Sequence, residues 1–275
     1  MTSNREIGIG PTAELSQRVS VATLARVLFK DRSDDEPMLA LERRATLRET
    51  SAGQGVKVKS QPFGGAIRIL DLGTVRGLLG EFHFDSERSR AEQDFRIFIR
   101  PSAWSSVREF CLQHIGGDND RILETSPSRE LVEEFAETLS INLKPEQYVF
   151  RPLTTIVENR AAPTDNIHAK GISTVRIYRI FEACISDPSL VHVMLENSRG
   201  VSDQRLCELA IADAEGGGKG KANAVLTLPW RRLEAVYQDM SPTARNFPIM
   251  FEQNQLDGSV VAIFDEISVP KYQRV

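Results

Sequence analysis

The chain has 275 residues, of which 41% are hydrophobic and 26% charged, a composition typical of a globular protein that buries a sizeable core. Its formal net charge of −4 excludes the general basic surface by which many proteins bind nucleic acid. An acidic chain that acts on a polyanionic substrate needs local basic groups or metal ions at its site.

Two further classes of protein are disfavoured. The first ten residues lack the apolar core of a signal peptide, and no apolar run approaches the roughly 18 residues of a membrane helix. Cys111, Cys184 and Cys207 are far apart and form no C-x-x-C pair, which favours buried thiols in a reducing compartment over a disulfide framework. We therefore expect a cytoplasmic protein that does not insert into a membrane.

The first elements predicted along the chain are two strands. Residues 1–18 are polar and show no periodicity, which predicts a loosely held segment. We expect one domain over residues 19–275. The β-branched and apolar run 19–29 predicts a buried strand, and 38–43 predicts a second strand that forms a hairpin with it. The Ser-, Gly- and Lys-rich stretch 50–59 predicts a loop.

Residues 61–66 read QPFGGA. Pro62 fixes one backbone angle, whereas Gly64 and Gly65 permit a positive φ or a close approach of the backbone to another group. Alone, the hexamer indicates an ordinary tight turn.

Residues 67–123 are expected to form an inserted or accessory segment, with a strand at 94–99 and an amphipathic helix at 104–114. Farther on we predict strands at 147–157, 173–185, 225–228 and 260–264, a flexible loop at 213–223 and a helix from 230 to 237. Strands interleaved with few helices predict a layered α/β or α+β fold.

The most informative segment follows residue 124. Ser126 is a natural N-cap and Pro127 suits the first helical position, so a helix is predicted from there. Leu131, Phe135 and Leu139 recur at steps of four and form an apolar stripe that is expected to pack on a sheet.

Four glutamates share another face of this helix. Glu130, Glu133, Glu134 and Glu137 lie at i, i+3, i+4 and i+7, where like charges repel by roughly 0.2–0.5 kcal/mol per pair. A divalent cation among them reverses this repulsion, because Mg²⁺ prefers oxygen ligands and leaves positions for water and phosphate. The alternative is a solvated acidic face near a helix N-terminus, where the macrodipole favours carboxylates.

The order of residue types at 129–134 (RELVEE) resembles the core of the Nudix box, written G-x5-E-x7-R-E-U-x-E-E-x-G-U with U aliphatic. Residues 62–65 (PFGG) resemble the Pro-Gly-Gly turn that opens the box. The resemblance covers roughly residues 19–66 and 124–267, and only its helix motif is specific. It implies an α/β/α sandwich with a mixed sheet, in which 67–123 is an insertion.

The resemblance also implies roles for individual residues. Glu130, Glu133 and Glu134 would bind Mg²⁺ or Mn²⁺, and Arg129, Glu133 and Glu134 would be the catalytic residues, with Arg129 orienting a glutamate. The ions would neutralise a diphosphate and position the attacking water. The expected reaction is hydrolysis of a nucleoside diphosphate linked to another group, and the expected partners are a nucleotide-like small molecule and a second copy in a homodimer.

Three further residues are candidates for contact with substrate. Gly64 and Gly65 open the box, and Lys219 lies in a GGGKGK run. That run is not a P-loop, because Glu215 and Ala222 occupy the positions of its first Gly and final Ser or Thr. A flexible loop is the alternative for the run.

The chain departs from the family's pattern at two points that concern activity. About sixty residues separate Gly65 from the helix, where the box has a short loop, and Arg121 replaces the glutamate expected eight residues before Arg129. Glu124 is the nearest carboxylate. These departures leave open an inactive Nudix-like module that senses a nucleotide or ADP-ribose-like ligand, and a purely structural interaction domain that binds no divalent ion.

Overall fold

The computed structural model describes residues 14–32, 35–50, 53–116, 120–157, 161–163 and 169–229. The helix predicted at 230–237 and the strand predicted at 260–264 lie outside these residues. Within the described ranges, no helix is both long and apolar enough to cross a membrane.

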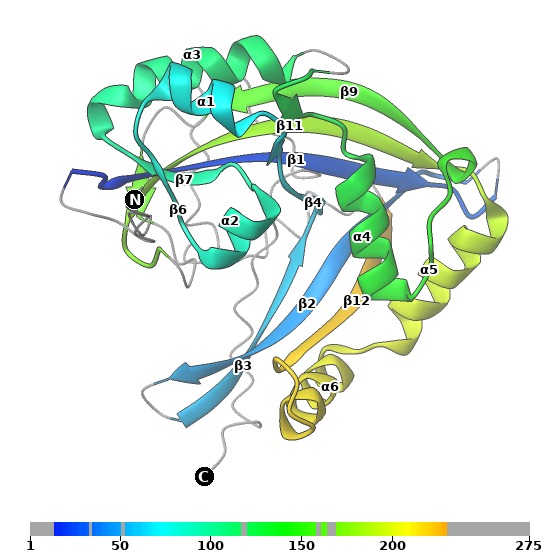
Figure 1. The fold of residues 1–275 in the computed structure, drawn as a ribbon. Coiled ribbons are helices and arrows are strands. Elements are labelled where there is room, and N and C mark those ends of the chain that lie inside the picture. Colours follow the sequence, from blue (N-terminus) through cyan, green and yellow to red (C-terminus); the bar gives the residue numbers. More distant parts are fainter. Residues whose placement is uncertain are drawn as a thin grey trace.

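Five strands come first along the chain, and helices are interspersed among the later strands (Figure 1). The strands are β1 (Gln17–Phe29), β2 (Met38–Thr50), β3 (Gly53–Gln61), β4 (Phe63–Ala66), β5 (Arg68–Ile69), β6 (His83–Phe84), β7 (Arg96–Ile99), β8 (Leu123–Glu124), β9 (Tyr148–Val157), β10 (Ala162–Pro163), β11 (Ser173–Ile185) and β12 (Lys221–Pro229). The helices are α1 (Leu72–Leu79), α2 (Glu87–Glu92), α3 (Trp104–Ile115), α4 (Ser128–Leu139), α5 (Pro188–Gly200) and α6 (Asp203–Glu215). The predicted α/β class with a large mixed sheet is confirmed.

Strand β1 organises the large sheet. Along almost its whole length it runs parallel to β11, from the pair Arg18–Thr174 to the pair Phe29–Ile185. Its other edge pairs in succession with β7, β4 and β2, each antiparallel to it. Apolar and β-branched residues in β1 and β11 suit this position, because both strands are paired on both edges.

Helices cover both faces of the sheet. Helices α3, α4 and α5 pack on one face, where the odd-numbered apolar residues of β1 enter the core. Helix α6 packs on the opposite face of the part formed by β2, β3 and β12, against Ala45, Val56 and Val58. Successive residues of a strand point to opposite faces, so β2 contributes to the core on both sides.

The segment 67–123 begins and ends at neighbouring points. Strand β5 at its start pairs with β8 at its end, with Arg68 opposite Glu124. Between them, β7 joins the large sheet, and Val107 and Cys111 of α3 pack with Val19 of β1 in one core. The segment therefore shares the hydrophobic core of the rest of the chain.

Two predicted loops are wrong. Most of residues 50–59 belongs to β3, because Val56 and Val58 are buried under α6 and the strand pairs with β2 along its whole length. At 213–223, α6 continues to Glu215 and β12 begins at Lys221, which leaves a turn of five residues. In both cases tertiary pairing outweighs the local preference of Gly, Ser and Lys for loops.

Smaller corrections concern the beginning of the chain, the QPFGGA hexamer and the thiols. Residues 17 and 18 belong to β1, and Leu15 is buried, so the loosely held segment does not extend to residue 18. The hexamer is not an isolated tight turn, because its last four residues form β4. Cys111 and Cys207 are buried free thiols, whereas the free thiol of Cys184 is exposed.

The contact between β4 and α4 provides a test of the packing. The rings of Phe63 and Phe135 are both fully buried, and their centroids lie 4.8 Å apart. We expect Phe135→Ala to lower the free energy of unfolding by roughly 3–5 kcal/mol, measured by urea denaturation, because it leaves a cavity. Leu78→Ala is the control, since Leu78 of α1 is 59% exposed. Equal effects of the two substitutions would contradict this packing.

Candidate metal and substrate site

Helix α4 presents one face to the sheet. Leu131 and Phe135 are buried against β4 and α5 as the apolar stripe predicts, while Leu139 is only half-buried. The helix begins at Ser128, with Pro127 as its N-cap residue rather than its first residue. The hydroxyl of Ser126 accepts a hydrogen bond from the Ser128 N–H at 3.2 Å, so it still satisfies one donor of the first turn.

The two glycines of β4 allow its backbone to approach both β1 and α4. Gly64 has φ of +143°, and a Cβ there would lie 2.2 Å from the Thr23 carbonyl oxygen of β1. A Cβ on Gly65 would lie 1.7 Å from a carboxylate oxygen of Glu130. The Gly64 N–H donates a hydrogen bond to the Glu134 carboxylate. The pair of glycines thus places two carboxylates of α4 against a bare backbone.

Glu134 is a buried carboxylate, with a relative exposure of 8%. Its pKa is raised well above the usual range, first by burial and then by the negative charge of Glu42, while the Gly64 N–H and Arg44 oppose the rise. Glu42, on β2, is fully buried at 0% exposure. It accepts hydrogen bonds from Arg44 and, at 2.8 Å, from Gln61 of β3.

Glu130 is the second carboxylate directed into the protein. Arg129 Nη2 lies 2.6 Å from Glu130 Oε1. Burial raises the pKa of Glu130, Arg129 opposes the rise, and the charges of Glu133 and Asp94 add to it. Asp94, from the segment before β7, is only 3% exposed, and burial also raises its pKa.

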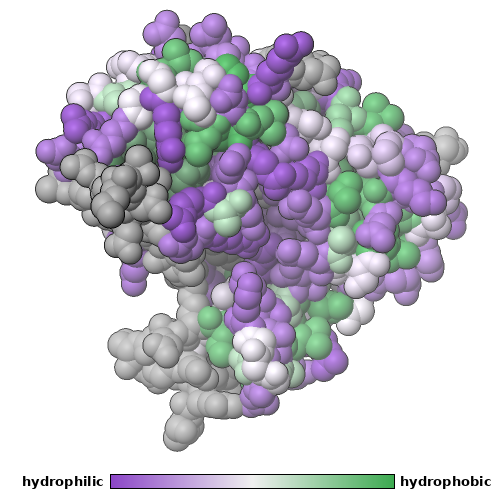
Figure 2. Space-filling model, viewed as in Figure 1, coloured by the Kyte–Doolittle hydropathy of each residue, from purple (hydrophilic) through white to green (hydrophobic). Residues whose placement is uncertain are grey.

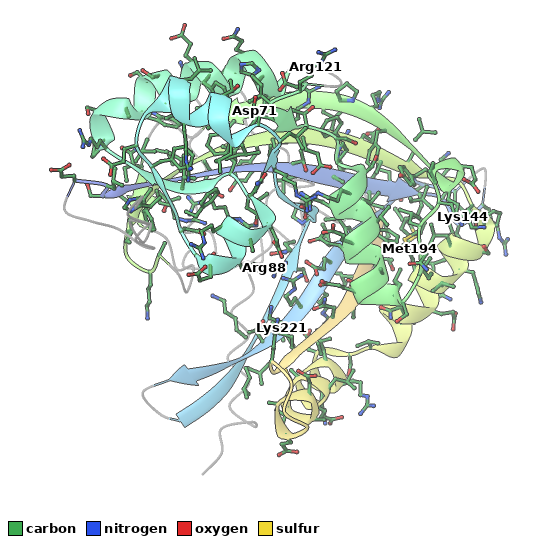
Figure 3. The ribbon with its side chains drawn as sticks, in the orientation of Figure 1. Asp71, Arg88, Arg121, Lys144, Met194 and Lys221 are labelled. Carbon is green, nitrogen blue, oxygen red and sulfur yellow. The ribbon has the colours of Figure 1, made fainter. Side chains whose placement is uncertain are left out.

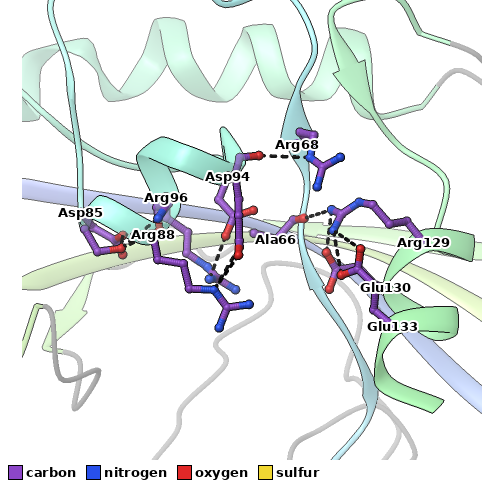
Figure 4. Close-up of polar contacts among 12 residues, drawn as sticks. Ala66, Arg68, Asp85, Arg88, Asp94, Arg96, Arg129, Glu130 and Glu133 are labelled. Carbon is purple, nitrogen blue, oxygen red and sulfur yellow. Dashed lines mark hydrogen bonds and ion pairs between the residues drawn. The ribbon is translucent and has the colours of Figure 1, made fainter. Parts of the chain in front are cut away.

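Arg129 connects four groups at the start of α4, and Figure 4 shows three of them, Ala66, Glu130 and Glu133. Its guanidinium donates to Glu124 at 2.6 Å and to the Ala66 carbonyl at 3.1 Å, and it pairs with Glu130 and Glu133. Arg129 therefore ties the end of β4 and strand β8 to the helix. It also limits the directions that the Glu130 carboxylate can take.

The four glutamates of the predicted acidic face have different environments. Glu134 is buried and Glu130 half-buried, whereas Glu133 and Glu137 are exposed, the Glu133 side chain by 53%. Across the described ranges, no three His, Cys, Asp or Glu side chains are grouped as a metal site requires. The predicted ligands Glu130, Glu133 and Glu134 thus do not meet around one point in this conformation.

The donor chemistry nevertheless fits a hard divalent cation. Carboxylate oxygens are its preferred ligands, and Glu130 and Glu134 have raised pKa values partly because negative charges face them. A cation beside these two groups would relieve that repulsion. The side chain of Glu133 is 53% exposed and pairs with Arg129.

Of the other residues singled out in the sequence, Arg121 and Lys219 lie outside the network around Arg129, and Glu124 belongs to it. Arg121 occupies the position where the box has a glutamate, so that position supplies no carboxylate to the site. Its side chain is exposed beside the end of α3 (Figure 3). Lys219 is exposed in the turn between α6 and β12, close enough to act electrostatically on Lys221. Glu124 pairs with Arg129, which makes it part of the network around the helix.

Two carboxylates at this site were missed by the sequence prediction. Glu42 follows the apolar run of residues 38–41, and a charged residue within a buried strand was the available signal. Asp94 was assigned only to a strand. Its proximity to Glu130 depends on how the segment 67–123 folds back, which no local pattern reveals.

Comparisons with protein-family models, with curated proteins and with solved structures find no match for this chain.

The close approach at Gly64 leads to a prediction about stability. We expect Gly64→Ala to lower the free energy of unfolding by roughly 1–3 kcal/mol or more, because the left-handed backbone and the Thr23 carbonyl both disfavour a Cβ. Gly77→Ala in α1, where a Cβ meets open space, is expected to raise stability by up to about 1 kcal/mol. Thermal and urea denaturation measure both. An unchanged free energy of unfolding in Gly64→Ala would refute the close approach of Gly64 to the Thr23 carbonyl.

Glu134 gives a pH-dependent prediction. Its pKa in the folded protein lies above its ordinary value of 4.5, so its contribution to stability is fully present below about pH 4.5 and is lost as pH rises through the folded pKa. Relative to Glu134→Gln, the wild type should become progressively less stable as pH rises from about 4.5. Urea denaturation across this range, without divalent ions, measures the difference. Parallel stability curves would show that Glu134 ionises normally.

Proposed function

We propose that this protein is a metal-dependent hydrolase that cleaves a diphosphate linkage in a substrate of the nucleoside-diphosphate-X type. The observation that best supports the proposal is the buried Glu134 carboxylate. It accepts a hydrogen bond from the Gly64 N–H, and the negative charges of Glu42 and Glu130 help to raise its pKa. Carboxyl groups with raised pKa values concentrate at functional sites, because their burial is costly to stability.

The alternative of a solvated acidic helix face explains less of the arrangement. Such a face would leave its carboxylates in water, where the helix dipole suffices to accommodate them. Glu133 and Glu137 fit that description, but Glu130 and Glu134 are turned toward the bare backbone of β4. The resemblance to the Nudix box independently implies Glu130 and Glu134 as metal ligands.

Under this proposal, Glu130 and Glu134 would hold Mg²⁺ or Mn²⁺ together with Glu133. The bound ion would neutralise the diphosphate oxygens and lower the pKa of the attacking water. Arg129 orients Glu130, and the Gly64 N–H orients one oxygen of Glu134.

A second candidate function is a binding module that senses a nucleotide or ADP-ribose-like ligand without hydrolysing it. Two observations favour it. Arg121, where the box has a glutamate, is exposed, and the described part of the chain contains no preformed group of three metal ligands. The same carboxylates and glycines would then serve recognition alone.

A cytoplasmic location belongs to the same proposal. Its support is that Cys111, Cys184 and Cys207 are all free thiols, as expected in a reducing compartment. A homodimer is proposed from the family resemblance alone.

The decisive experiment is a hydrolysis screen with Mg²⁺ or Mn²⁺ over nucleoside triphosphates, dinucleotides, NADH and ADP-ribose. We expect metal-dependent release of phosphate-containing products, and a loss of about a hundredfold or more in kcat for Glu134→Gln. Glu196→Gln is the matched control, because Glu196 lies exposed on α5 and contacts only Arg199 among the interactions seen. Its rate should equal that of the wild type.

The outcomes separate the two candidate functions. No turnover with any substrate, together with saturable binding of one ligand, would replace the hydrolase with the binding module. Turnover that persists in Glu134→Gln would place the active site elsewhere in the chain.

A further inference from the structure

Strand β8 is where the segment 67–123 returns to α4 (Figure 1). It is only two residues long and pairs with the equally short β5, and so short a ladder contributes little stability by itself. Its last residue, Glu124, accepts a hydrogen bond from Arg129 Nε at 2.6 Å. The position of Arg129 therefore depends in part on the contacts that hold β8 in place.

The carboxylate of Asp120 holds the start of β8. Its Oδ1 atom accepts hydrogen bonds from the N–H groups of Ile122 and Leu123, both at 2.8 Å. The Ile122 carbonyl in turn accepts a hydrogen bond from the Leu70 N–H at 2.8 Å. Leu123 is fully buried in the core beneath α3. One oxygen of Asp120 thus fixes the backbone immediately before Glu124.

The second oxygen of the same carboxylate contacts α3. His114 Nδ1 lies 2.8 Å from Asp120 Oδ2, and both side chains are largely buried. The His114 ring packs on the ring of Phe110, with centroids 4.6 Å apart. At the end of the same helix, the Ile115 carbonyl accepts a hydrogen bond from Arg179 of β11. Asp120 is therefore joined to a helix that is itself anchored to the large sheet.

The ionisation of Asp120 agrees with this arrangement. Burial by itself would raise the pKa of Asp120, but the hydrogen bonds with His114 and with the N–H groups of residues 122 and 123 lower it. A carboxylate with a lowered pKa is one whose charged form is stabilised by its donors. Hydrogen bonds to a charged acceptor are also stronger than those to a neutral one. The turn before β8 is accordingly held by a charged group.

We propose that Asp120 is a positioning residue for Arg129, and that His114 orients its carboxylate. Asp120 fixes the backbone before Glu124, and Glu124 accepts the Nε–H of Arg129. Arg129 Nη2 in turn lies 2.6 Å from Glu130 Oε1. This role rests on the proposed function, which assigns Glu130 to the metal. Figure 2 shows hydrophilic side chains gathered over α2 and α4, the region into which this series of contacts leads.

The test follows the Nε–H resonance of Arg129 by NMR in the full chain, with the resonance assigned by its absence in Arg129→Lys. The short bond to Glu124 should shift it downfield and slow its exchange with water. We expect Asp120→Ala to reverse the shift and to speed the exchange about tenfold. Asp120→Asn should preserve most of the wild-type signal, because an amide oxygen still accepts the two N–H groups. His114→Phe keeps the packing on Phe110 and should give an intermediate shift.

Asp187→Ala is the matched control. Asp187 also accepts a backbone N–H, that of Leu190 at 2.9 Å, but at the start of α5. Its removal should lower stability without moving the Arg129 resonance. In the hydrolysis assay, Asp120→Ala should lower kcat about tenfold with less than about a twofold change in KM. Asp187→Ala should change neither.

An Arg129 resonance that is unchanged in Asp120→Ala, or that moves equally in Asp187→Ala, would overturn the positioning role and leave a turn that only stabilises the fold. If Asp120→Ala does not fold, the resonance in His114→Phe decides in the same way. An unchanged kcat in Asp120→Ala, in a protein that turns substrate over, would also overturn the role. A shifted resonance in a protein that hydrolyses nothing would retain the contact from Asp120 to Arg129 and reject the hydrolase.

Discussion

The close approach of β4 to both β1 and α4 is the constraint on which the candidate site depends. Strand β4 is only four residues long, and its backbone lies between the Thr23 carbonyl and the carboxylates of Glu130 and Glu134. A side chain at Gly64 would clash with the backbone of β1, and one at Gly65 would displace the Glu130 carboxylate. Because Phe63 packs on Phe135 at the same place, the hydrophobic core holds the helix at the distance that the buried carboxylates require.

The segment 67–123 is built around the same constraint. Its two ends meet in the β5–β8 pair, and Arg129 donates to the Ala66 carbonyl just before the segment and to Glu124 at its end. The chain can therefore leave β4 and return to α4 without disturbing either. In returning it brings Asp94 toward Glu130 and Arg88 toward Lys221, so that the segment adds charge to the site as well as core to the sheet.

Electrostatic balance at the site is uneven along the sheet. Near the start of α4, Arg129 compensates Glu130, and the buried Glu42 is compensated by Arg44 and Gln61. Glu134 receives a backbone N–H and the more distant charge of Arg44, and its pKa remains raised. Beyond it, toward β12 and α2, charges of both signs alternate: Arg88 pairs with Glu92, and Glu137 acts on both Arg88 and Lys221.

The sequence by itself determined the elements whose periodicity is strong. Strands β1 and β11, helix α3, and the apolar stripe of α4 at Leu131 and Phe135 could be predicted because burial on one face leaves a regular pattern. It also identified Glu130 and Glu134 as residues of interest. Only the tertiary structure decided that β3 is a strand, that Glu133 is exposed, and that Glu42, Asp94 and Arg88 lie near α4. Those facts depend on pairing and packing between segments far apart in the chain, which local sequence does not encode.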